Sequence, residues 1–229
     1  MTRPAAADRS LLSRLARDAS VEVQVDDQGI EVRLAEPKLQ FTHSFVSGPI
    51  AQRARQSSQL LVKACNGKQR NIDDVLDLTA GWGVDALILA RHGQKVTLLE
   101  RNPLIHEILV QALERLANDS PEVARRMSLQ FSEANDFLQS LPSTQAFDCI
   151  YLDPMFPAHK SGAKPAKEMQ ILQALTDNHS IESCFETALN RARKRVVVKR
   201  AAKAPRLTDR KPDLVQRAKT IRFDIYLTG

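Results

Sequence analysis

Short apolar strands alternate with amphipathic helices over most of this chain, and this alternation most constrains its fold. The expected strands are residues 75–78, 95–100, 129–131, 147–152 and 195–199. The expected helices are residues 59–64, 83–92, 103–116, 167–175 and 181–193, with Asn102 as the N-cap of the third helix. Right-handed crossovers then give a parallel sheet with helices on both faces. A last strand, residues 220–227, can pair with residues 214–218 as an antiparallel edge.

The first 58 residues follow a different pattern. Residues 21–25 and 30–34 alternate apolar and polar side chains around an Asp-Asp-Gln-Gly turn, which predicts a β-hairpin. Residues 41–58 show no clear periodicity. We therefore divide the chain into a small N-terminal region with a hairpin, residues 1–58, and one α/β domain, residues 59–229.

Composition limits the partners and the location. Lys and Arg outnumber Asp and Glu by 33 to 27, and the net charge of +6 fits either a polyanionic partner or a mildly basic cytoplasmic protein. The cysteines, Cys65, Cys149 and Cys184, are far apart, so we expect neither a disulfide framework nor a metal site. The polar N-terminus and the lack of a long apolar run predict a protein of the reducing cytoplasm, without a signal peptide or a membrane partner.

The first strand of the expected sheet runs into a glycine-rich turn. Gly81 and Gly83 let the backbone turn sharply and approach a ligand, and the helix N-terminus behind them offers free N–H groups. Glu100 ends the second strand, 19 positions after Gly81, where a carboxylate can accept hydrogen bonds from both hydroxyls of a ribose. The alternative is an ordinary strand–turn–helix with glycines chosen for packing. The spacing of Glu100 favours a nucleoside cofactor.

Two neighbouring segments bear on the identity of this cofactor. The dinucleotide fingerprint GxGxxG is absent, which argues against a nicotinamide oxidoreductase. The turn resembles the methyltransferase pattern acid-x-G-x-G-x-G, with Asp77 as the acid and Thr79 in place of the first glycine. Asp77 suits a cationic sulfonium and amino group better than a pyrophosphate. Residues 132–136 reach the same edge and can contact an adenine, or form a polar loop with a helix cap at Asn135 or Asp136.

The fourth strand stops at Asp-Pro-Met-Phe-Pro, residues 153–157. This resembles the Asp/Asn-Pro-Pro-Tyr/Phe motif of amino-group methyltransferases, with Met155 in place of the second proline. Asp153 Oδ and the Pro154 carbonyl can accept the N–H of an aromatic amine and draw its nitrogen toward sp³ character. Phe156 can stack on an unstacked base, contributing about 1–3 kcal/mol. The alternative is a proline-rich loop with Asp153 as a turn cap.

Basic residues follow this motif. We interpret them as contacts to RNA phosphates, with a solvated loop as the alternative; they are His159, Lys160, Lys164 and Lys167. The basic runs at residues 191–195 and 199–203 either extend this surface or are solvated ends of a helix and a strand.

Several segments together resemble the bacterial small-subunit rRNA guanine-N2 methyltransferase family RsmJ. They are Leu-Glu-Arg-Asn-Pro at 99–103, Tyr-Leu-Asp-Pro-Met-Phe-Pro at 151–157, Lys-Glu-Met at 167–169, Lys-Arg-Val-Val-Val-Lys-Arg at 194–200 and Arg-Phe-Asp-Ile-Tyr at 222–226. The similarity extends from Glu36 to the end of the chain.

The resemblance implies a Rossmann-like class I S-adenosylmethionine-dependent methyltransferase with a mostly parallel seven-stranded sheet and an antiparallel C-terminal hairpin strand. It implies S-adenosylmethionine as cofactor, S-adenosylhomocysteine as its product, and N2-methylguanine in 16S rRNA, either free or in the small ribosomal subunit. The implied cofactor footprint is Val84, Asp85, Glu100, Arg101, Glu133, Ala134 and Asp153. Adenine N6, a protein glutamine, and a non-catalytic RNA-binding assembly factor remain as alternatives. The basic loop disfavours a protein substrate, and the intact acids disfavour a vestigial site.

Overall fold

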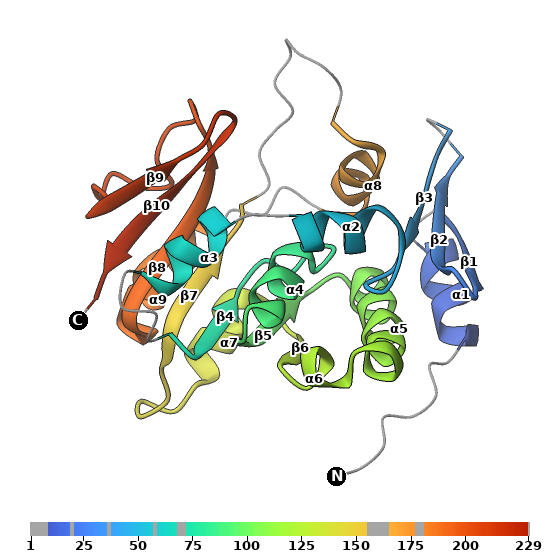
Figure 1. Ribbon diagram of the computed structural model, residues 1–229, viewed down its shortest axis with the longest axis horizontal. Helices are drawn as coiled ribbons and strands as arrows, with labels where there is room; N and C mark the ends of the chain where they lie inside the picture. Colours follow the sequence, from blue (N-terminus) through green and yellow to red (C-terminus); the bar gives the residue numbers. More distant parts are fainter. Residues whose placement is uncertain are drawn as a thin grey trace.

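The computed structural model describes residues 9–18, 21–35, 38–56, 59–67, 72–154, 165–176 and 181–228. Within these residues the chain forms a large seven-stranded sheet and a small three-stranded sheet. A C-terminal hairpin stands at one end of the molecule and the small sheet at the other (Figure 1). Among the described helices, none is both long enough and apolar enough to cross a membrane.

The large sheet has the strand order β6-β5-β4-β7-β8-β10-β9. Its strands are β4 (Asp74–Asp77), β5 (Lys95–Glu100), β6 (Met127–Phe131), β7 (Phe147–Leu152), β8 (Ala192–Ala201), β9 (Leu214–Arg217) and β10 (Ile221–Leu227). The strands from β6 to β8 pair in parallel, whereas β10 pairs antiparallel with β8 and β9. The predicted mostly parallel seven-stranded sheet with an antiparallel C-terminal hairpin is therefore confirmed.

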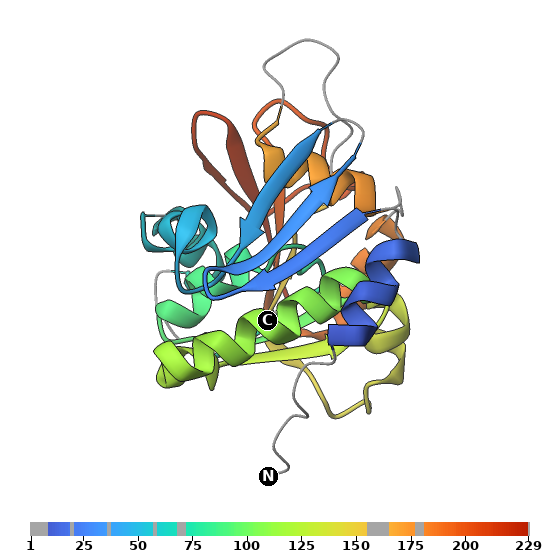
Figure 2. The ribbon, with the colours of Figure 1, turned by 90° about the vertical axis from the view of Figure 1, so that its right-hand side faces the viewer.

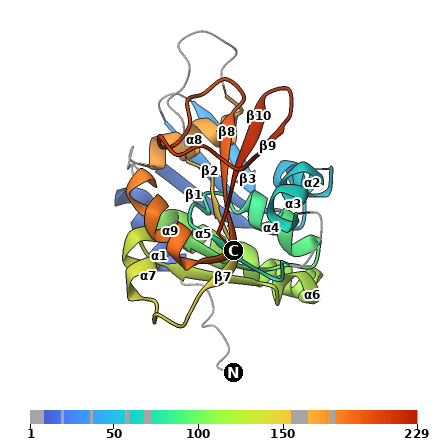
Figure 3. The same ribbon diagram turned by 90° about the vertical axis from the view of Figure 1, so that its left-hand side faces the viewer.

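Helices cover both faces of this sheet, as Figure 3 shows from the side of the C-terminal hairpin. One face carries α3 (Gln59–Asn66), α4 (Val84–Arg91), α5 (Pro103–Asp119) and α6 (Pro121–Ala124). The other carries α7 (Ala134–Ser140), the 3₁₀ helix η1 (Ile181–Cys184) and α9 (Phe185–Arg191). Alternate residues of a strand point to opposite faces, so Tyr151 joins the first core and Leu152 the second. The remaining helix, α8 (Lys167–Leu175), lies near the carboxyl ends of the strands.

The strand order reverses at β4, because β5 and β6 lie on one side of it and β7 lies on the other. In open α/β sheets, ligands bind at such a switch point, outside the carboxyl ends of the strands. Asp77 is the last residue of β4, and Asp153 directly follows β7. The topology therefore brings these two carboxyl groups to one crevice.

The N-terminal residues form more structure than the predicted hairpin. The hairpin is present as β1 (Val21–Asp26) and β2 (Gly29–Leu34). A third strand, β3 (Leu39–His43), pairs with β2, and two helices flank the sheet, α1 (Arg9–Asp18) and α2 (Gly48–Gln56). The sequence analysis missed β3 because the strand has only five residues, although Leu39 and Phe41 alternate with Gln40 and Thr42.

The small sheet lies against α5 and α8 (Figure 2). Ile30 and Val32 of β2 and Ile50 of α2 belong to the same buried cluster as the apolar residues of α4 and α5. The N-terminal region thus shares a core with the α/β part of the chain. The division at residue 58 stays a prediction.

Gly83 precedes α4 in a left-handed conformation, with φ of 69°, and is tightly enclosed. A Cβ there would lie 2.7 Å from Phe45 Cζ and 3.1 Å from Leu109 Cδ2. We expect Gly83→Ala to lower the free energy of unfolding by about 2–4 kcal/mol, because backbone strain and overpacking add. Gly48→Ala is the matched control, since Gly48 has φ of 70° and no atom within 4 Å of an added Cβ. Equal losses in urea unfolding would show that packing at Gly83 contributes nothing.

Candidate active site

A pocket of about 310 Å³ opens at the carboxyl ends of β4 to β8. Ten of the predicted site residues line it: Asp77, Gly81, Val84, Asp85, Glu100, Arg101, Glu133, Ala134, Asp153 and Pro154. Gly83 lies beside them as the residue before α4, and Lys167 is exposed at the first position of α8. Phe156, His159, Lys160 and Lys164 lie outside the described residues. The fold thus brings most of the predicted set together, while the role of each residue stays a prediction.

The side chain of Glu100 joins the glycine turn to the end of β5. Glu100 Oε2 accepts the N–H of Gly81 at 3.2 Å, and Oε1 accepts the N–H of Asn102 at 2.7 Å. Asn102 in turn caps α5, as predicted, by accepting the N–H groups of Leu104 and Ile105. Each oxygen of Glu100 therefore accepts at least one backbone N–H, and a carboxylate oxygen can accept more than one donor.

Thr79 explains why this turn departs from the glycine pattern. Its Oγ1 donates to Asp77 Oδ1 at 3.2 Å and accepts the N–H of Asp153 at 2.7 Å. A glycine has no hydroxyl and could make neither contact. Thr79 therefore joins the end of β4 to the turn after β7, a link that the sequence pattern did not indicate.

Two carboxyl groups of the pocket have raised pKa values. Burial raises the pKa of Asp77 to about 7, and the nearby charges of Asp85 and Asp153 act in the same direction. Burial likewise raises the pKa of Glu100 to about 7, against the lowering effect of its backbone N–H donors. Both groups change charge near neutral pH, so a cation or hydroxyl donor in the pocket would shift their ionisation.

Lys199 of β8 lies between two acids of the pocket. Its Nζ donates to Asp85 Oδ2 at 2.8 Å and to Asp153 Oδ2 at 2.7 Å. The hydroxyl of Tyr151 also donates to Asp85 Oδ2, at 2.5 Å. Burial alone would lower the pKa of Lys199, but the charges of Asp153 and Asp85 outweigh it and raise this pKa, so Lys199 stays a cation. The carboxylate of Asp153 is thereby held against the wall of the pocket.

The basic runs at residues 191–195 and 199–203 are only partly exposed. Lys199 lines the pocket, and Arg200 is buried with its Nε donating to the Pro205 carbonyl. At the opposite end of β8, Arg193 pairs with Asp148 and Asp74. Arg193 and Lys203 are nevertheless exposed, so an extension of the basic surface by these runs stays a prediction. The position of Lys199 at the carboxyl end of an apolar strand was the signal that could have placed it in the site.

The loop after β6 also differs from expectation. Glu133, rather than Asn135 or Asp136, caps α7, because its Oε2 accepts the N–H groups of Asn135 at 2.7 Å and Asp136 at 3.2 Å. A carboxylate at a helix N-terminus is favoured by the helix dipole. Glu133 also lines the pocket, so the residue that caps α7 borders the site as well.

The N-terminal region contributes to the site through α8. Trp82 Nε1 donates to the Glu168 carbonyl at 2.8 Å, and Arg53 of α2 forms an ion pair with the Glu168 side chain. Trp82 also packs against Phe41 of β3, with ring centroids 4.7 Å apart. Arg53 and Trp82 both line the pocket, although neither was predicted to do so. Within the described residues, no group of three or more His, Cys, Asp or Glu could hold a metal ion.

The sequence and the fold match those of S-adenosylmethionine-dependent methyltransferases. Residues 6–228 match the SAM_MT family model, which describes SAM-dependent methyltransferases. The crystal structure of a SAM-dependent methyltransferase from Neisseria gonorrhoeae superimposes with a TM-score of 0.72 and 27% identity, covering 97% of this chain and 93% of that one. The chain is therefore a class I methyltransferase that uses S-adenosylmethionine, as predicted.

Curated relatives narrow the class to one family. The relative from Thioalkalivibrio sulfidiphilus is 39% identical over 213 residues, covering 90% of this chain and 84% of its own length. The relative from Aeromonas salmonicida is 40% identical over 203 residues, covering 85% and 81%. Both are named ribosomal RNA small subunit methyltransferase J, and the chain belongs to this family. The predicted resemblance is confirmed.

Proposed function

We propose that this protein methylates the exocyclic N2 of a guanine in 16S rRNA. The observation that carries the proposal is the position of Asp153 and Pro154, at the end of β7 and in the wall of the cofactor pocket. The names of the curated relatives support small-subunit rRNA as the substrate. A cytoplasmic location would follow from that substrate.

The polar groups of the pocket fit this cofactor. Asp77 is a buried carboxyl group suited to a cationic partner, and Glu100 has acceptor capacity for ribose hydroxyls. Val84, Arg101 and Ala134 complete the proposed wall. When bound there, S-adenosylmethionine supplies an electrophilic methyl group on a positively charged sulfur.

We infer that Asp153 acts on the amine of the base. Its Oδ2 is held by Lys199, whereas no group among the described residues bonds Oδ1. Oδ1 and the Pro154 carbonyl can accept the amine N–H groups, which localises the nitrogen lone pair for attack. The new N–C bond leaves an extra proton on nitrogen, which Asp153 is positioned to accept. Phe156 is proposed to stack on the base.

Contacts to the RNA backbone are proposed for the basic residues around the start of α8. Lys167 is exposed there, where its ammonium group is available to a phosphate. His159, Lys160 and Lys164 are proposed to act in the same way. Such contacts orient the RNA and carry no base specificity.

Methylation in vitro tests the proposed reaction. Small subunits and naked 16S rRNA from cells lacking the protein are incubated with the enzyme and labelled S-adenosylmethionine, and the labelled nucleosides are identified by mass spectrometry. We expect N2-methylguanosine at one nucleotide. N6-methyladenosine, or label in protein, would overturn the assignment to guanine. Normal N2-methylation in cells lacking the protein would also contradict it.

The affinity for S-adenosylmethionine is expected to rise with pH. The ionised forms of Asp77 and Glu100 bind a cation and hydroxyl donors best, so binding releases protons below their pKa values of about 7. Between pH 6 and pH 8 the affinity should increase roughly 10- to 100-fold. Calorimetry would measure this slope, and Glu100→Gln should reduce it by removing one titrating group. A slope that Glu100→Gln leaves unchanged would exclude Glu100 as the ligand.

A further inference from the structure

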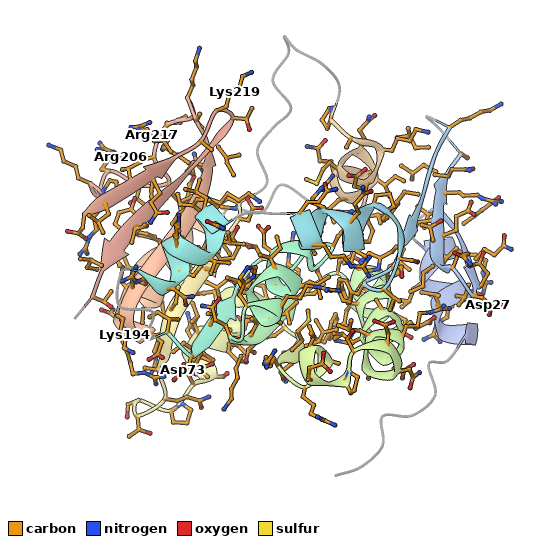
Figure 4. The ribbon with its side chains drawn as sticks, in the orientation of Figure 1. Asp27, Asp73, Lys194, Arg206, Arg217 and Lys219 are labelled. Carbon is orange, nitrogen blue, oxygen red and sulfur yellow. The ribbon has the colours of Figure 1, made fainter. Side chains whose placement is uncertain are left out.

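Residues 202–220 connect β8 to β9 and turn into β10, and they concentrate positive charge. We call this segment the basic hairpin. It contains six cations and two carboxylates, a net charge of +4 in a chain whose total is +6. All six cations are exposed: Lys203, Arg206, Arg210, Lys211, Arg217 and Lys219. Figure 4 shows Arg206, Arg217 and Lys219 along one end of the molecule, with Lys219 at the top.

A buried arginine fixes the base of the basic hairpin. Arg222 pairs with Asp224 through contacts of 2.8 and 3.0 Å, and both side chains are buried. The remaining donors of Arg222 reach backbone carbonyls of the connection, those of Ala201, Ala202, Ala204 and Pro205, at 2.7 to 3.3 Å. Arg200 also donates to the Pro205 carbonyl. The chain that leads into the exposed cations is therefore held in place by charged hydrogen bonds.

Strand register places the tip of the basic hairpin at the edge of the sheet that carries the reaction centre. Val198 of β8 pairs with Leu152, the residue before Asp153, and Ala201 pairs with Ile221 at the start of β10. At about 3.3 Å per residue, the hairpin turn stands roughly 10 Å beyond the end of β7. β9 lies three strands away from β7, or roughly 14 Å at about 4.8 Å per strand. An RNA strand with one base at Asp153 could span this distance with a few nucleotides.

Protection of the sheet edge is a competing explanation for these charges. β9 is an edge strand, with Leu214 and Val215 exposed, and cations on an edge strand discourage pairing with other chains. That explanation covers Arg217. It does not cover Arg206 or Arg210, which lie in the connection before β9. A polyanion accounts for all six cations together.

We propose that the basic hairpin is a docking surface for the phosphate backbone of the RNA substrate. The proposal rests on the proposed function, because it assigns a second contact region to the same substrate. It adds a region that is distant in sequence from the basic residues after Asp153. The basic hairpin would hold the RNA backbone a few nucleotides from the target base.

The test compares two triple variants that each remove three positive charges. The first is Arg206→Ser, Arg217→Ser and Lys219→Ser. The control is Arg17→Ser, Lys95→Ser and Arg125→Ser, three exposed cations elsewhere on the chain. We expect the first variant to raise the KM for RNA about 10- to 100-fold and to reduce the slope of log Kd against log salt by about 2 to 3. The kcat at saturating RNA and the affinity for S-adenosylmethionine should stay within about twofold.

Equal KM values and equal salt slopes for the two triple variants would overturn the proposal. The proposal would also be overturned if the wild type bound anionic vesicles but not RNA, and if the first variant lost this vesicle binding. The basic hairpin would then be a membrane-binding surface. Filter binding to small-subunit RNA measures docking independently of methylation. It therefore distinguishes failure of the docking proposal from failure of the proposed function. If the wild type binds RNA through the basic hairpin but methylates no guanine, the docking surface stands and the assignment to guanine fails.

Discussion

Lys199→Met is expected to lower kcat about 100-fold or more and to shift the acid limb of the pH–rate profile to higher pH. Without the cation, Asp85 and Asp153 face each other as like charges, and burial adds to the cost of ionising both. Asp153 would then hold a proton at neutral pH and could not accept the proton of the amine. Activity should partly recover as the pH is raised.

Two further variants distinguish this electrostatic role of Lys199 from a purely structural one. Lys199→Arg keeps a cation between the two carboxylates and should restore much of the activity and the original acid limb. Lys194→Met is the matched control, because Lys194 lies on the same strand and contacts Asp148 at the opposite end. It should leave kcat and its pH dependence unchanged. A Lys199→Met enzyme with the wild-type pH profile, and with activity lost only in proportion to its folded fraction, would contradict the proposed role.

Asp153→Ala is expected to reduce kcat about 100- to 1,000-fold, the usual effect of removing one hydrogen-bonding group that acts in the transition state. The variant loses the acceptor for the amine N–H and the partner that Lys199 holds. Asp153→Asn keeps a carbonyl oxygen at the same position and should lose less, since the related motif also uses Asn. Single-turnover measurement separates this chemical step from RNA binding.

Two measurements test whether Asp153→Ala loses activity only because the protein unfolds or no longer binds the cofactor. S-adenosylhomocysteine should still bind, because the other residues of the implied cofactor footprint are intact. The thermal unfolding midpoint should remain close to the wild type, because the backbone N–H of residue 153 can still donate to Thr79. The KM for RNA should change little, because phosphate contacts dominate RNA affinity. More than one tenth of the wild-type kcat in Asp153→Ala would argue that this carboxylate takes no part in the reaction.

Local patterns predicted those parts of the fold that depend on neighbouring residues. The bounds of β5, β7 and α8 agree with the expected ranges, and Asn102 caps α5 as its residue type suggested. Strand and helix periods, caps and turns are encoded within a few positions of the chain. The acids at strand ends were predictable for the same reason, because parallel strands present their carboxyl ends at one edge.

Contacts between distant segments were outside the reach of these patterns. Lys199 is 114 positions from Asp85 and 46 from Asp153, and its contacts with both acids depend on the pairing of β8 with β7. Arg53 and Trp82 enter the pocket through Glu168, which is 115 and 86 positions away, respectively. The pairing of β3 with β2 also depends on a neighbouring element.

Local residue patterns were enough to predict the class of this protein: a parallel sheet whose first and second strands end in Asp77 and Glu100 and whose fourth strand is followed by Asp153. How those acids are charged and held depends on contacts that form when the chain folds. Strand register between β7 and β8 sets Lys199 against Asp153, and burial brings the pKa values of Asp77 and Glu100 to about 7. Ionisation depends on the distances between charges and on their exposure to solvent, and both are set only once the strands are packed together.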